Sequence, residues 1–168
     1  MTLQITREDV VRDVTDIGLR VRLSIPATWK EAPVEGSILV VGGQLDDSDQ
    51  TLVPTVQIGV RKAESAEAAA QAVLGVVAEL DDAAVGFQWS GTGASRMPEA
   101  ILEVAHRSRL TRATQVSMFR EIYVEAKGLA LTVVGTIGGG ASTEARDALR
   151  EVLTSVSVGP MPPGTPAS

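Results

Sequence analysis

The chain of 168 residues contains no cysteine, which excludes disulfide bonds, thiolate metal sites and a cysteine nucleophile. It has one histidine, His106, so the sequence lacks the nitrogen ligands that a metal site usually needs. Aromatic residues make up only 3% of the chain, so valine and alanine must fill much of the core. These absences give no reason to expect a cofactor.

Basic residues are also few, and the net charge is −6. This balance argues against a nucleic-acid partner and against an anionic membrane surface, because both need clustered Lys and Arg. Residues 1–9 lack the basic start and apolar run of a signal peptide, and no run is long enough to span a bilayer. We therefore expect a cytoplasmic chain, unless an export segment preceded it.

What is present is the composition of a globular protein, with 44% hydrophobic and 21% charged residues. The length suits one domain with its own core. The pattern predicts a domain over residues 1–158, followed by a mobile tail rich in Pro and Gly over residues 159–168.

The clearest pattern lies between residues 113 and 158. Residues 116–124 and 129–137 alternate with period two on either side of Ala126-Lys127-Gly128, which predicts an antiparallel hairpin with one buried face. On this view Glu121 and Glu125 lie on the solvated face. After Gly138-Gly139-Gly140 the apolar period becomes helical as far as residue 156.

Further strands are predicted at residues 19–25, 37–41, 56–60 and 100–107, with a short strand at Phe87 and Trp89 and loops at residues 44–50 and 91–97. A helix follows Ser65, its expected N-cap. Residues 1–17 fit either a helix or a strand. The fold class is therefore α+β, with an antiparallel sheet of about six to seven strands covered by two main helices.

The order of these elements resembles a known group. The strand that ends in Ile25-Pro26-Ala27-Thr28-Trp29 resembles the opening of proteins with the Mog1/PsbP-like fold, and the chain looks most like the actinobacterial LpqN-like proteins. The likeness continues through the helix after Ser65, Met97-Pro98-Glu99-Ala100, the hairpin and the final helix. The resemblance implies a mostly non-catalytic role, such as binding a GTPase, docking on a photosystem or chaperoning effectors, with no shared catalytic residue.

Two stretches could bind ions. Gly139, Gly140 and Ser142 precede a helix, where free N–H groups could hold an anion; the alternative is a turn followed by a Ser142 or Thr143 cap, since no phosphate-loop motif is present. Asp46, Asp47 and Asp49 could gather around calcium, but Leu52 stands where an EF-type loop needs glycine, which favours a solvated loop.

Other candidates have ordinary structural explanations. His106 is interpreted as a plain strand residue, because no triad partner is evident. Glu121 and its neighbouring carboxylates are expected to be solvated and paired with arginines rather than catalytic. Trp29 and Trp89 are expected to be core anchors, or an interaction site if they prove exposed together. The carboxylates and arginines of this expectation are Glu99, Glu103, Glu121, Glu125, Arg107, Arg109 and Arg120.

Three function classes follow. The first is a non-catalytic protein-binding, adaptor or chaperone-like domain whose partner is another protein. The second is a binder of apolar small molecules, with a pocket beside Met118 between sheet and helix. The third is an enzyme, which would need a desolvated carboxylate or His106 in a cleft. A homodimer through an open sheet edge is a further expectation.

Overall fold

The computed structural model describes residues 6–32, 34–43, 54–80, 89–90, 95–98, 100–107 and 113–161. Eleven strands, two α-helices and one 3-10 helix occur in these ranges. In chain order they are β1 (Arg7–Val14), β2 (Leu19–Pro26), β3 (Lys30–Glu31), β4 (Leu39–Gly42), β5 (Thr55–Lys62), α1 (Ala66–Leu80), β6 (Trp89–Ser90), β7 (Ser95–Pro98), β8 (Leu102–Arg107), β9 (Thr114–Val124), η1 (Glu125–Lys127), β10 (Leu129–Gly138), α2 (Thr143–Ser155) and β11 (Ser157–Pro160).

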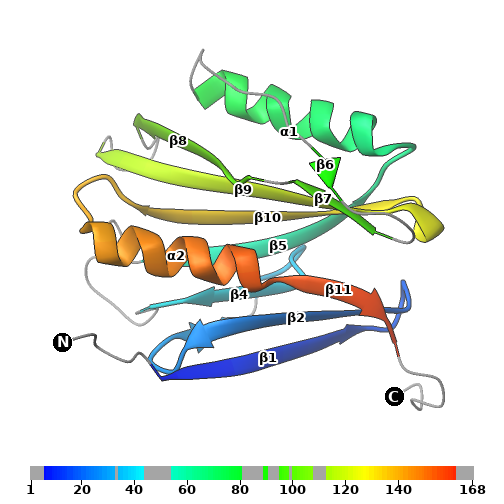
Figure 1. Cartoon of the computed structure of the whole chain (residues 1–168), viewed down its shortest axis with the longest axis horizontal. Coiled ribbons are helices and arrows are strands. Elements are labelled where there is room, and N and C mark those ends of the chain that lie inside the picture. The colour runs from blue at the N-terminus through cyan, green and yellow to red at the C-terminus, as the bar shows by residue number, and fades with distance from the viewer. Residues whose placement is uncertain are drawn as a thin grey trace.

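The strands form two antiparallel sheets (Figure 1). The large sheet has eight strands in the order β3-β4-β5-β10-β9-β7-β6, with β8 also paired to β9. The small sheet has the order β1-β2-β11. The predicted α+β class and antiparallel sheet are confirmed. The large sheet exceeds six to seven strands because very short segments such as Lys30–Glu31 pair at its edges.

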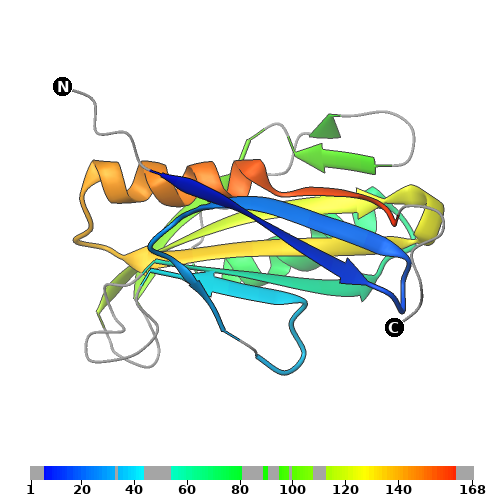
Figure 2. The same ribbon diagram turned by 90° about the horizontal axis from the view of Figure 1, so that it is seen from below.

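The two faces of the large sheet are covered differently. Helix α1 packs on β8, β9 and β10 from one side, whereas α2 and the small sheet cover the other (Figures 1 and 2). The main core lies on the α2 side, where β2, β5, β9, β10 and α2 interdigitate. Two smaller apolar clusters lie beneath α1.

Local chemistry explains the element boundaries. The Ser65 hydroxyl accepts a hydrogen bond from Ala68 N–H, and that of Ser142 accepts one from Ala145 N–H, so both predicted N-caps are confirmed. The hairpin turns at Gly128, whose φ of 61° is a left-handed conformation that glycine adopts without strain.

Both ends of the described chain are strands of the small sheet. Residues 7–14 form strand β1, the strand alternative of the two predicted for residues 1–17, because they pair along their whole length with β2. The tail is predicted from Gly159 onward, yet Gly159 and Pro160 belong to β11 and lie opposite Arg20 and Leu19. Short-range composition does not reveal this pairing, since its partner is distant in sequence.

Candidate functional site

Strand β9 directs two neighbouring charged side chains to opposite faces of the sheet, since strand side chains alternate. Arg120 lies on the side of α2, and Glu121 lies on the side of α1. Both are buried, and Glu121 has no exposed surface. Burying a charge costs free energy unless hydrogen bonds or an opposite charge compensate it, so these two residues are candidates for a functional role.

Arg120 is satisfied by backbone carbonyls at the C-terminal end of α2. Its Nη1 donates to Leu153 O at 2.5 Å, Val156 O at 2.7 Å and Thr154 O at 3.1 Å, and its Nη2 lies 3.2 Å from Met97 Sδ. The last carbonyls of a helix lack intrahelical partners and carry partial negative charge, so a guanidinium suits them. Burial lowers the pKa of Arg120 from its ordinary value.

Glu121 has fewer partners. Thr132 Oγ1 donates to its carboxylate at 2.9 Å, and Arg61 Nη2 lies 3.5 Å away while also donating to Ala69 O at 2.8 Å. Burial raises the pKa of Glu121 to about 7, although the Arg61 charge and the Thr132 hydrogen bond both act to lower it. The expectation of a solvated Glu121 paired with a surface arginine is therefore wrong, because α1 covers this face.

The α1 side of the sheet also carries a small apolar cluster. Tyr123, Ala130, Ala66 and Ala69 form a small buried cluster, and Trp89 packs against its edge. Trp89 is half-buried, and the Arg96 guanidinium lies 5.9 Å from its ring centre. Arg96 also pairs with Glu67 of α1 at 3.6 Å, so strands β6 and β7 hold the N-terminal end of this helix.

Helix α1 has an unusual outer face. Ala68, Ala72, Gly75 and Val76 are all exposed there, and Val76 is 50% exposed. A surface helix normally shows charged residues to water, as α2 does with Asp147 and Glu151 among others. We refer to Ala68, Ala72, Gly75 and Val76 as the α1 outer face.

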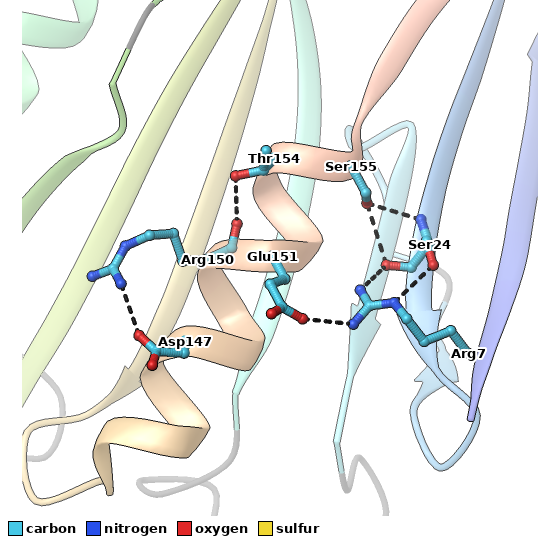
Figure 3. A pocket seen from close by; sticks show the side chains of 7 residues that line it. All are labelled: Arg7, Ser24, Asp147, Arg150, Glu151, Thr154 and Ser155. Atoms are coloured by element: carbon cyan, nitrogen blue, oxygen red, sulfur yellow. Dashed lines mark hydrogen bonds and ion pairs between the residues drawn. The ribbon is translucent and has the colours of Figure 1, made fainter. Parts of the chain in front are cut away.

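A second surface feature is a shallow groove of about 510 Å³ between α2 and β2 (Figure 3). Arg7 reaches across it and donates to Ser24 O at 2.9 Å and to Glu151 at 3.0 Å. Arg150 pairs with Asp147 at 3.0 Å on the same helix and with Glu103 of β8. Because each arginine already has a carboxylate partner, the groove offers no uncompensated charge to a ligand.

The predicted interaction residues do not form one site. Trp29 is 8% exposed and belongs to the main core on the α2 side, whereas Trp89 packs beside α1, so the two rings are separated by the sheet. Gly139 N–H donates to Thr114 O, Ser142 caps α2, and Gly140 lies in the turn between them. These bonds fit a turn and a cap; an anion at this turn stays a prediction.

His106 is half-buried on β8, and its Nε2 lies 2.8 Å from Ser117 Oγ. A histidine beside a serine is the start of a catalytic pair, but His106 Nδ1 meets only the Arg107 carbonyl at 3.1 Å. Ser117 is 3% exposed, so its hydroxyl does not reach a substrate. This pair is therefore a hydrogen bond between neighbouring strands, as expected for an ordinary strand residue.

Several predicted features lie outside the described residues: Asp46, Asp47, Asp49, Phe87, Glu99 and Arg109. Within the described ranges, no group of three or more His, Asp or Glu side chains could hold a metal ion. In the same ranges, no helix has both the length and the apolar character needed to cross a bilayer. Glu125, which lies in η1, and Arg107, at the end of β8, are exposed.

No protein-family model matches the chain, and none of the curated proteins matches its sequence. Solved structures do match. LpqN of Mycobacterium tuberculosis, a protein involved in cell envelope biogenesis, gives a TM-score of 0.55 at 15% identity, with 92% of each chain covered. The Ran-binding protein Mog1p of Saccharomyces cerevisiae gives 0.53 at 8% identity, covering 92% of this chain and 96% of its own.

A crystal structure from Bacteroides thetaiotaomicron matches with a TM-score of 0.48 at 16% identity. The match covers 86% of this chain, which spans only 46% of that protein's length. The likeness to LpqN and Mog1p confirms that the chain has the Mog1/PsbP-like fold predicted from its sequence. At these identities the likeness concerns the fold, while function must be argued from the surface.

Proposed function

We propose that this chain is a non-catalytic protein-binding domain, and that its partner docks on the α1 outer face. The observation that carries the proposal is the exposure of four small or apolar residues on one side of a helix whose other side is fully packed. Contiguous apolar surface of this kind often marks a site of protein association. Mog1p, a protein of the same fold, is a Ran-binding protein, which makes a protein partner reasonable.

The chemistry of the surface limits the partner. Glu67, Gln71 and Glu79 are the exposed polar residues along α1, and the helix carries no basic residue. A partner that fits would bring an apolar ridge to the flat centre of the helix, where Ala72 and Gly75 allow close approach. Its rim would be basic, since rim charges of opposite sign guide association.

The two other function classes have weaker support. Met118 is fully buried within a packed core, and none of the described cavities opens beside it. The cavity lined by Leu19, Val124 and Val158 measures about 100 Å³, which is smaller than a usual ligand pocket. An enzyme would need an accessible desolvated group, whereas Glu121 is covered by α1 and has no exposed surface.

The test compares two arginine substitutions at exposed helix positions. Ala72→Arg places a bulky charge at the centre of the α1 outer face, and Thr154→Arg places the same group at an exposed position of α2, across the large sheet from α1. Affinity purification from the native host should recover a protein partner with the wild type and with Thr154→Arg, and lose it with Ala72→Arg. Unchanged thermal unfolding of both variants serves as the folding control.

A partner retained equally by all three proteins would place binding elsewhere and overturn the proposal. Recovery of no protein by the wild type, after cross-linking in the host, would remove its support altogether.

A further inference from the structure

A second surface of the molecule, the free edge of strand β1, leads to a different partner. In the small sheet, β1 has a neighbour only on the side of β2, and no other described strand pairs with it (Figure 1). An edge of this length presents backbone donors and acceptors that another strand can pair with. Val11 on this strand is 44% exposed.

The hydrogen-bonding pattern between β1 and β2 shows which residues of β1 direct their backbone N–H and C=O groups to the free edge. Ala27 N–H donates to Thr6 O at 2.8 Å, so Thr6 and Ala27 form a hydrogen-bonded pair. Such pairs alternate along an antiparallel ladder, so Glu8, Val10, Arg12 and Val14 direct their backbone groups to β2. Ser24 confirms this pattern. It lies opposite Asp9, yet its N–H donates to Ser155 Oγ on the other side of β2.

The remaining residues of the strand therefore direct their backbone N–H and C=O groups to the free edge. These residues are Arg7, Asp9, Val11 and Asp13. They also place their side chains on the outer surface of the small sheet, whereas Glu8, Val10 and Arg12 place theirs on the inner surface.

We propose that a second copy of this chain pairs with β1 in antiparallel fashion, about a two-fold axis at Val10, and joins the two small sheets into one. This register places Arg7 opposite Asp13 of the second copy on the outer surface. It places Glu8 opposite Arg12 of the second copy on the inner surface. Each pair occurs twice by symmetry, which is the self-complementary pattern of a two-fold interface.

Neighbouring registers lack this complementarity. Side chains of the same surface stay opposite one another only when the pairing shifts by two residues, which moves the two-fold axis by one residue. Centring the axis on Val11 places Asp9 opposite Asp13, and centring it on Asp9 places Asp9 opposite itself. Like charges directly opposite are unfavourable, so the sequence of β1 selects the register centred on Val10.

The inner-surface pair agrees with the existing contacts, whereas the outer-surface pair requires one of them to change. Both Asp13 oxygens accept from Arg20, at 2.6 and 2.9 Å, and this ion pair stays when Arg7 of the second copy approaches. Arg7 now donates to Ser24 and Glu151 through all three guanidinium nitrogens, and in the dimer it turns from them to the free edge. Arg12 pairs with Glu31, and Glu8 of the second copy would add a second carboxylate. Glu8 has no ion pair with any described residue, so it is available for this contact.

Sedimentation velocity over a concentration series tests the dimer with one blocking variant. Val11→Pro removes an N–H group that points to the free edge, and leaves the β1–β2 ladder intact. Val11→Thr is the matched control, because it keeps the N–H group and suits a strand. We expect the wild type and Val11→Thr to dimerise, and Val11→Pro to stay monomeric with an unchanged circular dichroism spectrum.

Two further variants test the register without altering the backbone. Glu8→Arg replaces each of the two attractive contacts with Arg12 by a contact between like charges, and should weaken the dimer by roughly tenfold. Asp9→Asn should leave the dissociation constant unchanged, since Asp9 faces Val11 in the proposed register. In either neighbouring register, Asp9→Asn would remove a repulsion and strengthen the dimer.

A monomer at every concentration would overturn the proposal, as would a dimer that survives both Val11→Pro and Glu8→Arg. A dimer that Asp9→Asn strengthens would overturn the register. The α1 variant Ala72→Arg should not change dimerisation, so this result is independent of the protein-binding proposal.

Discussion

Arg120 and Glu121 are neighbours in sequence and yet are stabilised in different ways on the two faces of the sheet. Arg120 meets three carbonyl oxygens at the end of α2 within 3.1 Å. Glu121 meets one hydroxyl at 2.9 Å and one guanidinium at 3.5 Å beneath α1. On the α2 face, backbone carbonyls stabilise the Arg120 guanidinium. On the α1 face, the Glu121 carboxylate has few polar partners.

This difference makes the α1 face sensitive to pH. The pKa of Glu121 is about 7 in the folded chain against an ordinary value of 4.5. Because the folded state binds this proton more tightly, Glu121 contributes stability that is fully present below about pH 4.5 and is lost as pH rises through 7. The shift corresponds to about 3 kcal/mol. Arg120 stays charged, so the α2 face contributes no such dependence.

Arg120→Met should have the largest effect. It removes the cation while leaving the Leu153 and Val156 carbonyls buried without their donor, and loss of one partner from such a cluster costs about 3–5 kcal/mol. Urea unfolding at pH 7 measures the loss. Arg150→Met, which removes an arginine from exposed pairs, is the control and should cost less than about 1 kcal/mol. Equal losses would contradict the role given to the α2 carbonyls.

Glu121→Gln should have the next largest effect, with the opposite sign. The neutral amide can still accept from Thr132 and has no charge to desolvate. At pH 8 the variant should be more stable than the wild type by up to about 3 kcal/mol, and at pH 4 the difference should vanish. Unfolding curves at the two pH values measure this. A destabilised variant at pH 8 would show that the carboxylate is well compensated.

Two glycine substitutions compare the packing of the faces. A Cβ at Gly135 would lie 2.6 Å from Leu153 Cδ1, whereas one at Gly59, which shares the α1 face with Thr132, meets nothing within 4 Å. Gly135→Ala should therefore cost about 1–3 kcal/mol through overpacking, while Gly59→Ala should be neutral or slightly stabilising. Thermal unfolding of both variants measures this difference in stability. Similar melting temperatures would show that the two faces are packed equally tightly at these glycines.

Thr132→Val should have the smallest effect. It removes the hydroxyl that donates to Glu121, so it should cost about 1 kcal/mol at pH 8 and less at pH 4, where the carboxyl is protonated. Thr136→Val removes a comparable hydroxyl, which hydrogen-bonds Thr55 at 2.6 Å. Its cost should not change with pH. If Thr132→Val also showed no pH dependence, the hydroxyl would not be acting on the charge of Glu121.

The sequence predicts most of the fold because its local signals are strong. Alternation in β9 and β10, the left-handed turn at Gly128 and the caps at Ser65 and Ser142 all depend on short-range chemistry. The pairing of β11 with β2 joins segments more than a hundred residues apart, and no local pattern indicates it.

The candidate site was harder to predict. Glu121 lies on the face of β9 that also carries Phe119 and Tyr123, and these aromatic residues are the signal that the face is covered. The serine and glutamine residues on the same face obscure that signal. The alanine-rich α1 shows one buried stripe, but nothing in its sequence indicates which part of the sheet it covers. Arg120 is equally hidden, because its partners are backbone carbonyls.

The most direct test of the difference between the faces is an NMR titration of the Glu121 side-chain carboxyl carbon, assigned by comparison with Glu121→Gln. We expect a titration midpoint of about 7, well above the ordinary value of 4.5, because burial beneath α1 disfavours the anion. A midpoint at or below the ordinary value would contradict a poorly compensated carboxylate on the α1 face. It would show that Arg61 and Thr132 stabilise the carboxylate as fully as the α2 carbonyls stabilise Arg120.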